Sequence, residues 1–148
     1  MSNLSQCLHA FITEFLNFGV KHVVICPGSR NFPIIKTVVA ANKFVKIHSA
    51  VDERSAGFLT LGLAQQTNSP VVVCCTSGTA SLNLYPAIAE AYYSETPIIV
   101  LTADRPAESV DNWEGQCIRQ NQVFDQHVVA SFVSPENLSD ELVFKQCA

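Results

Sequence analysis

Four short polar stretches in this sequence hold residue types that could bind a ligand. They are Cys-Pro-Gly-Ser-Arg at 26–30, Asp-Glu-Arg at 52–54, Thr-Ser-Gly-Thr at 76–79 and Ala-Asp-Arg-Pro at 103–106. The planar guanidinium groups of Arg30 and Arg105 suit a carboxylate. Gly28 and Gly78 allow the backbone to approach a ligand closely, and the hydroxyl groups beside them add hydrogen-bonding capacity. These residue types predict the binding of a carboxylate or another anion.

Each stretch alone also has an ordinary structural explanation. Residues 26–30 could form a plain turn, and residues 76–79 could cap a helix. Asp52 could cap the helix that follows it, with Glu53 at the positive end of that helix. The two arginines could form surface ion pairs. Neither glycine-containing stretch matches the dinucleotide-binding or P-loop pattern, so these two kinds of nucleotide site have no support.

The positions of the four stretches along the chain favour a shared function. Strands are predicted at 20–26, 44–50, 71–76 and 97–103, and helices at 4–18, 34–41, 53–67 and 79–95. Short β-branched strands that alternate with longer helices indicate an α/β fold, with a central, mostly parallel sheet flanked by helices. Each polar stretch follows one strand, and ligands of such sheets bind beyond the carboxyl ends of the strands. The pattern therefore predicts one site at that edge.

Three segments depart from the regular pattern. Pro86 fits the helix at 79–95 only near its start or at a kink. Periodicity is lost from 104 to 126, and a loop of this length in a compact domain is usually functional when it is ordered. Ser134 and Pro135 then have the residue types of an N-cap and a first helical position, which predicts a last helix.

Composition limits the class of protein. The chain has 148 residues, 48% hydrophobic and 15% charged, which suffices for a single domain with a sizeable core. No apolar run is long enough to span a membrane, and the N-terminus lacks the features of a signal peptide, so we expect a cytoplasmic protein. The net charge is −4 and the nine lysines and arginines are scattered, which argues against a nucleic-acid partner.

The cysteines and histidines give no sign of a metal centre. The six cysteines include no Cys-x-x-Cys pair, and their spacing suits neither zinc nor a disulfide framework. We expect buried, reduced thiols, with the adjacent Cys74 and Cys75 on opposite faces of a strand. The histidines also lack ligand spacing, so no metal site is predicted in this chain.

Taken together, the polar stretches and their flanking residues carry a family resemblance. The blocks are CPGSRNFP, DERSAGFLTLGLA, TSGTASLNLYPAIAEA, LTADRP and GQCIRQ. In order and spacing, from about residue 5 to about residue 125, the chain resembles the N-terminal, pyrimidine-binding domain of thiamine-diphosphate-dependent enzymes. The Pro-Gly-Ser-Arg and Ala-Asp-Arg-Pro stretches, followed by Ile-Arg-Gln, resemble in particular the 2-succinyl-5-enolpyruvyl-6-hydroxy-3-cyclohexene-1-carboxylate synthase family of menaquinone biosynthesis. The resemblance implies an enzyme that decarboxylates 2-oxoglutarate and adds the succinyl-semialdehyde carbanion to isochorismate.

The resemblance assigns roles to particular residues. It implies that Glu53 is the catalytic carboxyl group, which hydrogen-bonds the aminopyrimidine ring of thiamine diphosphate and shares a proton with it. Pro27, Thr76 and Gly78 match the cofactor-binding positions. The chemistry itself belongs to the cofactor.

The resemblance also implies a substrate site. Ser29, Arg30 and Arg105 match residues that contact substrate carboxylates, and both substrates are dicarboxylates. Gln116 matches the second residue of a family Asn-Gln pair, whereas Gly115 stands in place of the asparagine. Arg119 and Gln120 also match the family, with no role assigned.

The family's active site is shared between domains. Residues 1–148 match one pyrimidine-binding domain, and we find no counterpart of the family's middle domain or of its C-terminal domain. That last domain would hold the diphosphate through Mg²⁺, and it would come from another subunit. We therefore expect a half-site that is inactive alone, and self-association into a homo-oligomer.

Two alternatives remain open. The chain could be the corresponding domain of another thiamine-diphosphate carboligase, of the acetolactate-synthase type, although arginines at two strand ends disfavour this. It could instead be a standalone, non-catalytic domain that pairs with a partner chain.

Overall fold

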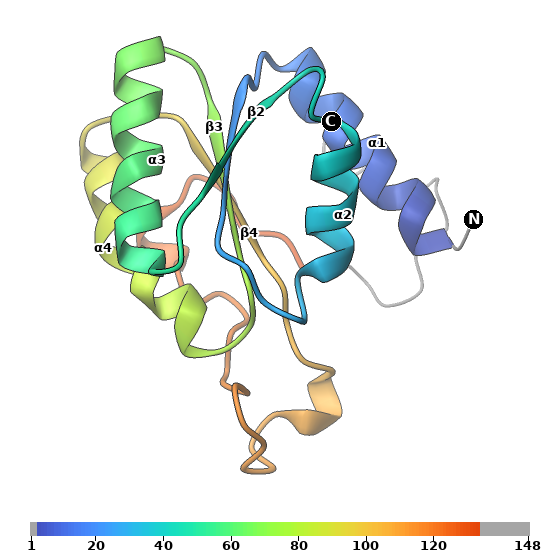
Figure 1. Cartoon of the computed structure of the whole chain (residues 1–148). Coiled ribbons are helices and arrows are strands. Elements are labelled where there is room, and N and C mark those ends of the chain that lie inside the picture. The colour runs from blue at the N-terminus through green and yellow to red at the C-terminus, as the bar shows by residue number, and fades with distance from the viewer. Residues whose placement is uncertain (1–2, 134–148) are drawn as a thin grey trace.

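The computed structural model describes residues 3–133 (Figure 1). The helix predicted from Ser134 lies outside the described residues. Within residues 3–133, four α-helices and four strands alternate: α1 (Asn3–Asn17), β1 (His22–Ile25), α2 (Phe32–Ala40), β2 (Lys46–Ser49), α3 (Glu53–Thr67), β3 (Val71–Cys75), α4 (Thr79–Tyr93) and β4 (Ile98–Thr102). Two short 3₁₀ turns follow, η1 (Ala107–Ser109) and η2 (Asp125–His127).

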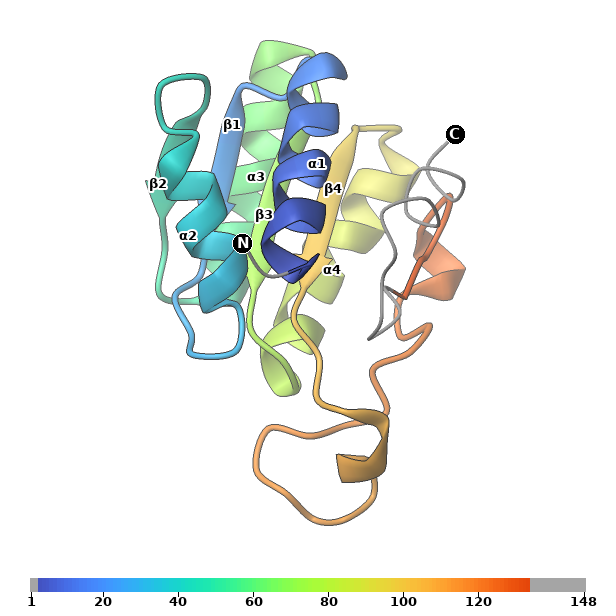
Figure 2. The same ribbon diagram turned by 90° about the vertical axis from the view of Figure 1, so that its right-hand side faces the viewer.

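The strands form one parallel sheet in the order β2-β1-β3-β4. Helices α1 and α2 cover one face of this sheet, and α3 and α4 cover the other (Figures 1 and 2). This arrangement confirms the predicted α/β fold with helices on both sides of a parallel sheet.

The central position of strand β3 in the sheet explains why its sequence is uniformly apolar. All five of its residues are buried. Val71, Val73 and Cys75 belong to the core cluster beneath α3 and α4, while Val72 belongs to the cluster beneath α1 and α2. Cys74 contacts Asn31 at the start of α2, so the adjacent cysteines do point to opposite faces, as predicted. Cys26, Cys74 and Cys75 are buried free thiols. Cys117 departs from the expectation because it lies in the surface loop and is only partly buried.

Several boundaries differ from those predicted, for local reasons. Helix α2 begins at Phe32 rather than Ile34, because Pro33 is accommodated in the first helical turn. Strand β2 begins at Lys46 rather than at residue 44, because Phe44 and Val45 close a turn back to Ala41. Pro86 lies in the interior of α4 and not near its start. Its ring is on the exposed face of the helix.

Two helices end where the sequence predicted. Gly19 follows α1 with a φ of +85°, and Asn68 follows α3 in the left-handed conformation, with φ 48° and ψ 42°. Among the helices within residues 3–133, none combines the length and the apolar character that a membrane span requires.

Candidate active site at the carboxyl ends of the strands

The four polar stretches lie at one edge of the sheet, below the strands in Figure 1. Backbone hydrogen bonds continue the ladder into this edge: Cys26 N–H donates to the Cys74 carbonyl at 2.8 Å, and Ala103 N–H donates to the Cys75 carbonyl at 3.1 Å. Because β1 and β4 flank β3, the turns with Arg30 and Arg105 lie on either side of residues 76–79. Two strand spacings separate them, or about 10 Å.

The turn at 26–31 packs closely against Thr76, the residue that follows β3. A Cβ atom on Gly28 would lie 2.6 Å from Thr76 Cβ, so only glycine fits there. Asn31 is fully buried, and its Nδ2 donates to the Cys26 carbonyl at 2.9 Å. Pro27, Ser29 and Arg30 remain exposed. The turn is therefore a fixed support that presents its exposed residues to solvent or ligand.

Sequence reasoning overlooked Asn31. Its Oδ1 is buried and accepts no hydrogen bond from the described residues. The available signal was an amide residue between the turn and the first apolar residues of the following helix. That signal does not distinguish a buried anchor from an exposed cap.

Helix α3 begins with two carboxylates that have different environments. Asp52 is the N-cap, and its Oδ1 accepts the Ser55 backbone N–H at 2.8 Å. That backbone hydrogen bond lowers the pKa of Asp52. This confirms the capping interpretation of Asp52.

Glu53, the first residue of α3, is half-buried, and its side chain makes no hydrogen bond within residues 3–133. Its charge acts on thiols at the ends of β1 and β3. Burial raises the pKa of Cys26 to about 12, and the Glu53 charge adds to that effect. Burial likewise raises the pKa of Cys75, again with a smaller contribution from Glu53. The Glu53 carboxylate therefore lies near the carboxyl ends of the two central strands, with its oxygens available.

The start of α4 is closely packed against the long loop. Gly78 has φ +79° and ψ −142°, a conformation that is essentially restricted to glycine. A Cβ atom there would lie 2.7 Å from the Gln116 carbonyl oxygen. Ser77 Oγ donates to that same oxygen at 3.1 Å, and the Gly78 N–H donates to Gln120 Oε1 at 2.9 Å. The Gly78 amide thus already has a hydrogen-bond partner within the chain. Thr76 is buried as well, and it packs against Gly28.

Arg105 lies at the start of the long loop, and part of its guanidinium group is hydrogen-bonded within that loop. Its Nη2 donates to the Gly115 carbonyl at 3.0 Å. Its Nε is buried and has no acceptor among the described residues. An unpaired buried guanidinium N–H is costly, so this nitrogen marks a position where an anion would be stabilised.

Other residues of the loop are placed differently. The Gln116 side chain is exposed and its backbone has a φ of +57°. Arg119 pairs with Asp111 at 2.9 Å on the surface, with 81% of the arginine side chain exposed. An exposed pair of this kind contributes little stability. Trp113 is fully exposed.

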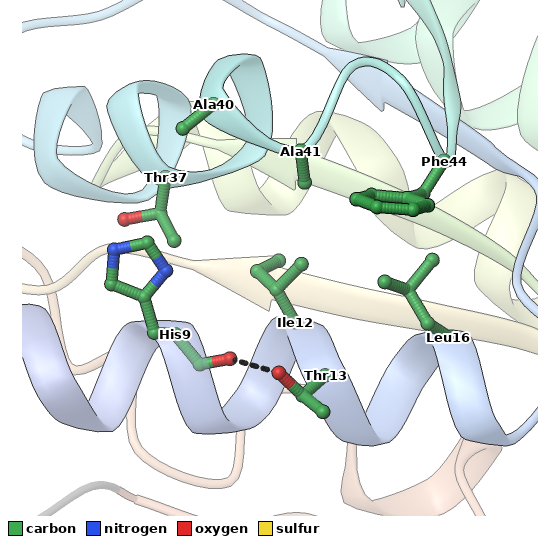
Figure 3. Close-up of a pocket in the computed structure, with 8 residues that line it drawn as sticks. All are labelled: His9, Ile12, Thr13, Leu16, Thr37, Ala40, Ala41 and Phe44. Carbon is green, nitrogen blue, oxygen red and sulfur yellow. Dashed lines mark hydrogen bonds between the residues drawn. The ribbon is translucent and has the colours of Figure 1, made fainter.

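A separate groove lies between α1 and α2 (Figure 3). It has a volume of about 190 Å³ and is lined by apolar side chains such as Ile12, Leu16 and Phe44, with His9 at one end. None of the predicted site residues lines it. Within the described part of the chain, no cluster of three or more metal-ligating side chains occurs.

A half-buried carboxylate and two arginines at one edge of the sheet, beside two closely packed glycines, suit a ligand with both a proton-exchanging group and carboxylates. The family model "Thiamine pyrophosphate enzyme, N-terminal TPP binding domain" matches residues 6–128. The chain belongs to this family. The match confirms the family resemblance and the fold class predicted from the sequence.

Curated relatives narrow the similarity further. The chain is 50% identical over 126 residues to a 2-succinyl-5-enolpyruvyl-6-hydroxy-3-cyclohexene-1-carboxylate synthase from Christiangramia forsetii, covering 85% of this chain and 21% of the relative. It is 51% identical over 123 residues to the synthase of the same name from Bacteroides fragilis, covering 83% of this chain and 22% of the relative. The corresponding protein from Bacillus velezensis is 46% identical over 125 residues, covering 84% of this chain and 22% of the relative. The chain thus spans about a fifth of the length of the relatives that it matches.

Proposed function

We propose that this chain is the pyrimidine-binding domain of a thiamine-diphosphate-dependent synthase. The enzyme would decarboxylate 2-oxoglutarate, release CO₂ and join the remaining succinyl-semialdehyde unit to isochorismate, as a cytoplasmic step of menaquinone biosynthesis. Support comes from the family match over residues 6–128 and from the names of relatives about 50% identical to this chain.

The observation that carries the proposal is the pair of carboxylates at the start of α3. Asp52 takes over the capping of the helix, and this leaves the neighbouring Glu53 half-buried with its oxygens available. When bound, thiamine diphosphate supplies the carbanion-stabilising centre. The Glu53 carboxyl group would hydrogen-bond the pyrimidine nitrogen of the cofactor and hold a shared proton there. Pro27, Thr76 and Gly78 would shape the surface against which the ring packs.

The substrate carboxylates would bind between the two arginines. Arg105 is oriented by its hydrogen bond to the Gly115 carbonyl and keeps a buried Nε without an acceptor. Arg30 and Ser29 project from the fixed turn on the other side of β3. Gln116 would add an amide from the loop. Two cations on separate strands suit substrates that each carry two carboxylates.

Gly115 replaces the asparagine of the family pattern without a steric reason. A Cβ atom at this position has nothing within 4 Å, so the space for a larger side chain exists. The backbone carbonyl of Gly115 still orients Arg105. We propose that the site relies on Gln116 and the arginines in place of that asparagine amide.

Completion of the site would require a second domain. We propose that Mg²⁺ and the diphosphate bind to a diphosphate-binding domain of another subunit in a homo-oligomer. Exposed apolar side chains on the outer face of α3 and α4 support docking at this face. These are Phe58, Leu59, Leu82 and Tyr93.

The acceptor specificity of the complete enzyme tests the proposal. With 2-oxoglutarate as donor, isochorismate should be consumed and a 2-oxo acid acceptor should not. Arg105→Gln should raise the KM of a dicarboxylate substrate about tenfold to hundredfold, because a charge-assisted hydrogen bond is lost. Lys43→Gln removes an exposed cation of the α2–β2 turn and should leave KM unchanged.

Two outcomes would overturn this assignment. Carboligation onto a 2-oxo acid in preference to isochorismate would indicate a carboligase of the acetolactate-synthase type. No reaction with either acceptor, in an enzyme that binds thiamine diphosphate, would indicate a non-catalytic pairing domain.

A further inference from the structure

We propose that Gln120 is a positioning residue for the substrate site: its buried amide group fixes the long loop so that Gln116 and Arg105 face the ligand. This inference rests on the proposed function, because it concerns how that site is held together. Gln120 itself does not touch the candidate ligand position. It acts through Gly78 and through the end of β4.

The amide of Gln120 joins two strand ends that are distant in the sequence. Its Oε1 accepts the Gly78 N–H at 2.9 Å. Its Nε2 donates to the Ala103 carbonyl at 2.7 Å and to Thr102 Oγ1 at 3.1 Å. Gln120 is only 7% exposed, so both ends of its amide are satisfied inside the protein. A buried and fully paired amide of this kind defines one arrangement of its neighbours.

This clamp lies between the two loop residues implicated in substrate binding. Gly78, which Gln120 holds, packs directly against the backbone of Gln116. Ser77, the residue before it, donates to the Gln116 carbonyl. At the other end, Ala103 comes two residues before Arg105, whose guanidinium group reaches back to the Gly115 carbonyl. Gln120 therefore closes a ring of contacts that includes Gln116 and Arg105.

The ring of contacts holds the backbone of Gln116. Its φ of +57° lies in the left-handed region, which residues with a side chain adopt less readily than glycine does. Ser77 and Gly78 both contact the Gln116 carbonyl group, so they fix the residue in this conformation. Loss of the clamp should release Gln116 to a more ordinary conformation and displace its side chain amide.

A substitution by glutamate separates positioning from mere packing. A neutral carboxylic acid has one donor and one acceptor, so protonated Gln120→Glu can keep the hydrogen bonds to the Gly78 N–H and the Ala103 carbonyl and loses the one to Thr102 Oγ1. When ionised, it brings a negative charge against the Ala103 carbonyl oxygen in a buried place, and both effects favour its departure. The variant should thus switch with pH, whereas Gln120→Met, which has similar volume and no amide, should lose the clamp at every pH.

The first experiment uses the 148-residue chain and does not depend on enzymatic activity. The protection factor of the Gly78 amide against hydrogen exchange is measured at pH 8 and at pH 5. In Gln120→Glu it should fall about tenfold to hundredfold at pH 8 and return close to the wild-type value at pH 5. Asn121→Ala, an exposed neighbour, should match the wild type at both pH values.

Two results would overturn the inference in this experiment. Unchanged protection in Gln120→Met, which offers no acceptor to the Gly78 N–H, would mean that the side chain only fills space. Equal loss of protection in Gln120→Glu at both pH values would mean that the hydrogen bonds of the amide are not what fixes Gly78.

The second experiment uses the complete enzyme and tests the link to the substrate. Gln120→Glu should raise the KM of the dicarboxylate substrates at pH 8 much more than at pH 5, relative to wild type at the same pH, with a smaller effect on kcat. A pH-dependent protection change without a KM change would refute the positioning role. If Arg105→Gln also left KM unchanged, the substrate site itself would be refuted.

Discussion

The N-termini of α3 and α4 lie at the same edge of the sheet, yet they are completed in different ways. Helix α3 is capped by its own neighbour, because the Asp52 carboxylate accepts the Ser55 N–H. Helix α4 has Gly78 at its N-cap and no side-chain cap of its own. The Gly78 amide is satisfied by Gln120, which lies 42 residues further along the chain.

The difference has a functional consequence. A local cap at α3 leaves Glu53 free for a ligand and makes that helix end independent of the rest of the site. A distant cap at α4 couples the helix end to the long loop, so the loop residues Gln116 and Arg105 are positioned by tertiary contacts. We infer that the part of the site proposed to share a proton is built locally, and that the part proposed to bind carboxylates is built by long-range contacts.

The largest effect on stability is expected from a side chain added at Gly78, where the start of α4 packs against the long loop. Gly78→Ala forces a side chain into a positive φ and places Cβ 2.7 Å from the Gln116 carbonyl oxygen. We expect a loss of about 2–4 kcal/mol in the free energy of unfolding, as measured by urea denaturation. Gly62→Ala is the matched control, because its Cβ has nothing within 4 Å. It should stabilise α3 by about 0.5–1 kcal/mol. If Gly78→Ala and Gly62→Ala changed the free energy of unfolding equally, the close packing of Gly78 against the loop would be contradicted.

A smaller effect is expected at the local cap. Asp52→Ala removes the acceptor for Ser55 and should lower the Tm less than Gly78→Ala does, whereas Asp52→Ser should retain most of the wild-type Tm. The pKa of Asp52 is lowered in the folded state, so its contribution is present above its ordinary pKa of 3.8 and is lost as the pH falls below that value. The Tm difference between wild type and Asp52→Ala should therefore shrink from pH 7 to pH 3. A difference that grew on acidification would contradict the capping role.

The smallest effect is expected beside β2, the outer strand of the sheet that lies farthest from β4. His22 Nδ1 and His48 Nε2 form a hydrogen bond of 3.0 Å between β1 and β2. Burial, together with the charges of His22 and Lys46, lowers the pKa of His48 below 6.5. As the pH falls, His48 in the unfolded chain therefore binds a proton at a higher pH than His48 in the folded chain does. Stability should thus decrease as the pH falls below about 6.5. His48→Gln should weaken this dependence slightly in Tm measurements between pH 7.5 and pH 5. It should leave the Gly78 amide protection unchanged, since β1 and β3 separate β2 from β4 and the loop that follows it.

The features that could be predicted from the sequence are those that depend on residues close together in the chain. The alternation of strands and helices, the cap at Asp52 and the opposite orientation of Cys74 and Cys75 all follow from periodicity or from residues within one turn. The short blocks around the strand ends were sufficient to identify the family. The sequence left two positions open for Pro86, near the start of α4 or at a kink, and Pro86 lies in the interior of the helix, where packing of α4 against the sheet offsets the local cost.

What the sequence did not predict depends on tertiary contacts. The Gln120 clamp joins residues that are 42 positions apart. The family block ends at Gln120, but nothing near it in the sequence indicates that its amide is buried or which groups it contacts. The buried role of Asn31 and the pairing of Arg119 with Asp111 likewise require the folded chain. These contacts arise where loops meet, and loops lack the periodicity that makes helices and strands predictable.

The proton-sharing role of Glu53 is the central claim, and exchange of the C2 proton of bound thiamine diphosphate tests it most directly. The measurement compares the complete wild-type enzyme with Glu53→Gln, after equal cofactor binding has been verified. We predict that exchange is slower by about 100-fold or more in the variant, since a positioned acid–base group contributes at least this much. The variant should keep its fold, because Asp52 still caps α3. Exchange at close to the wild-type rate would contradict the claim and assign the start of α3 a purely structural role.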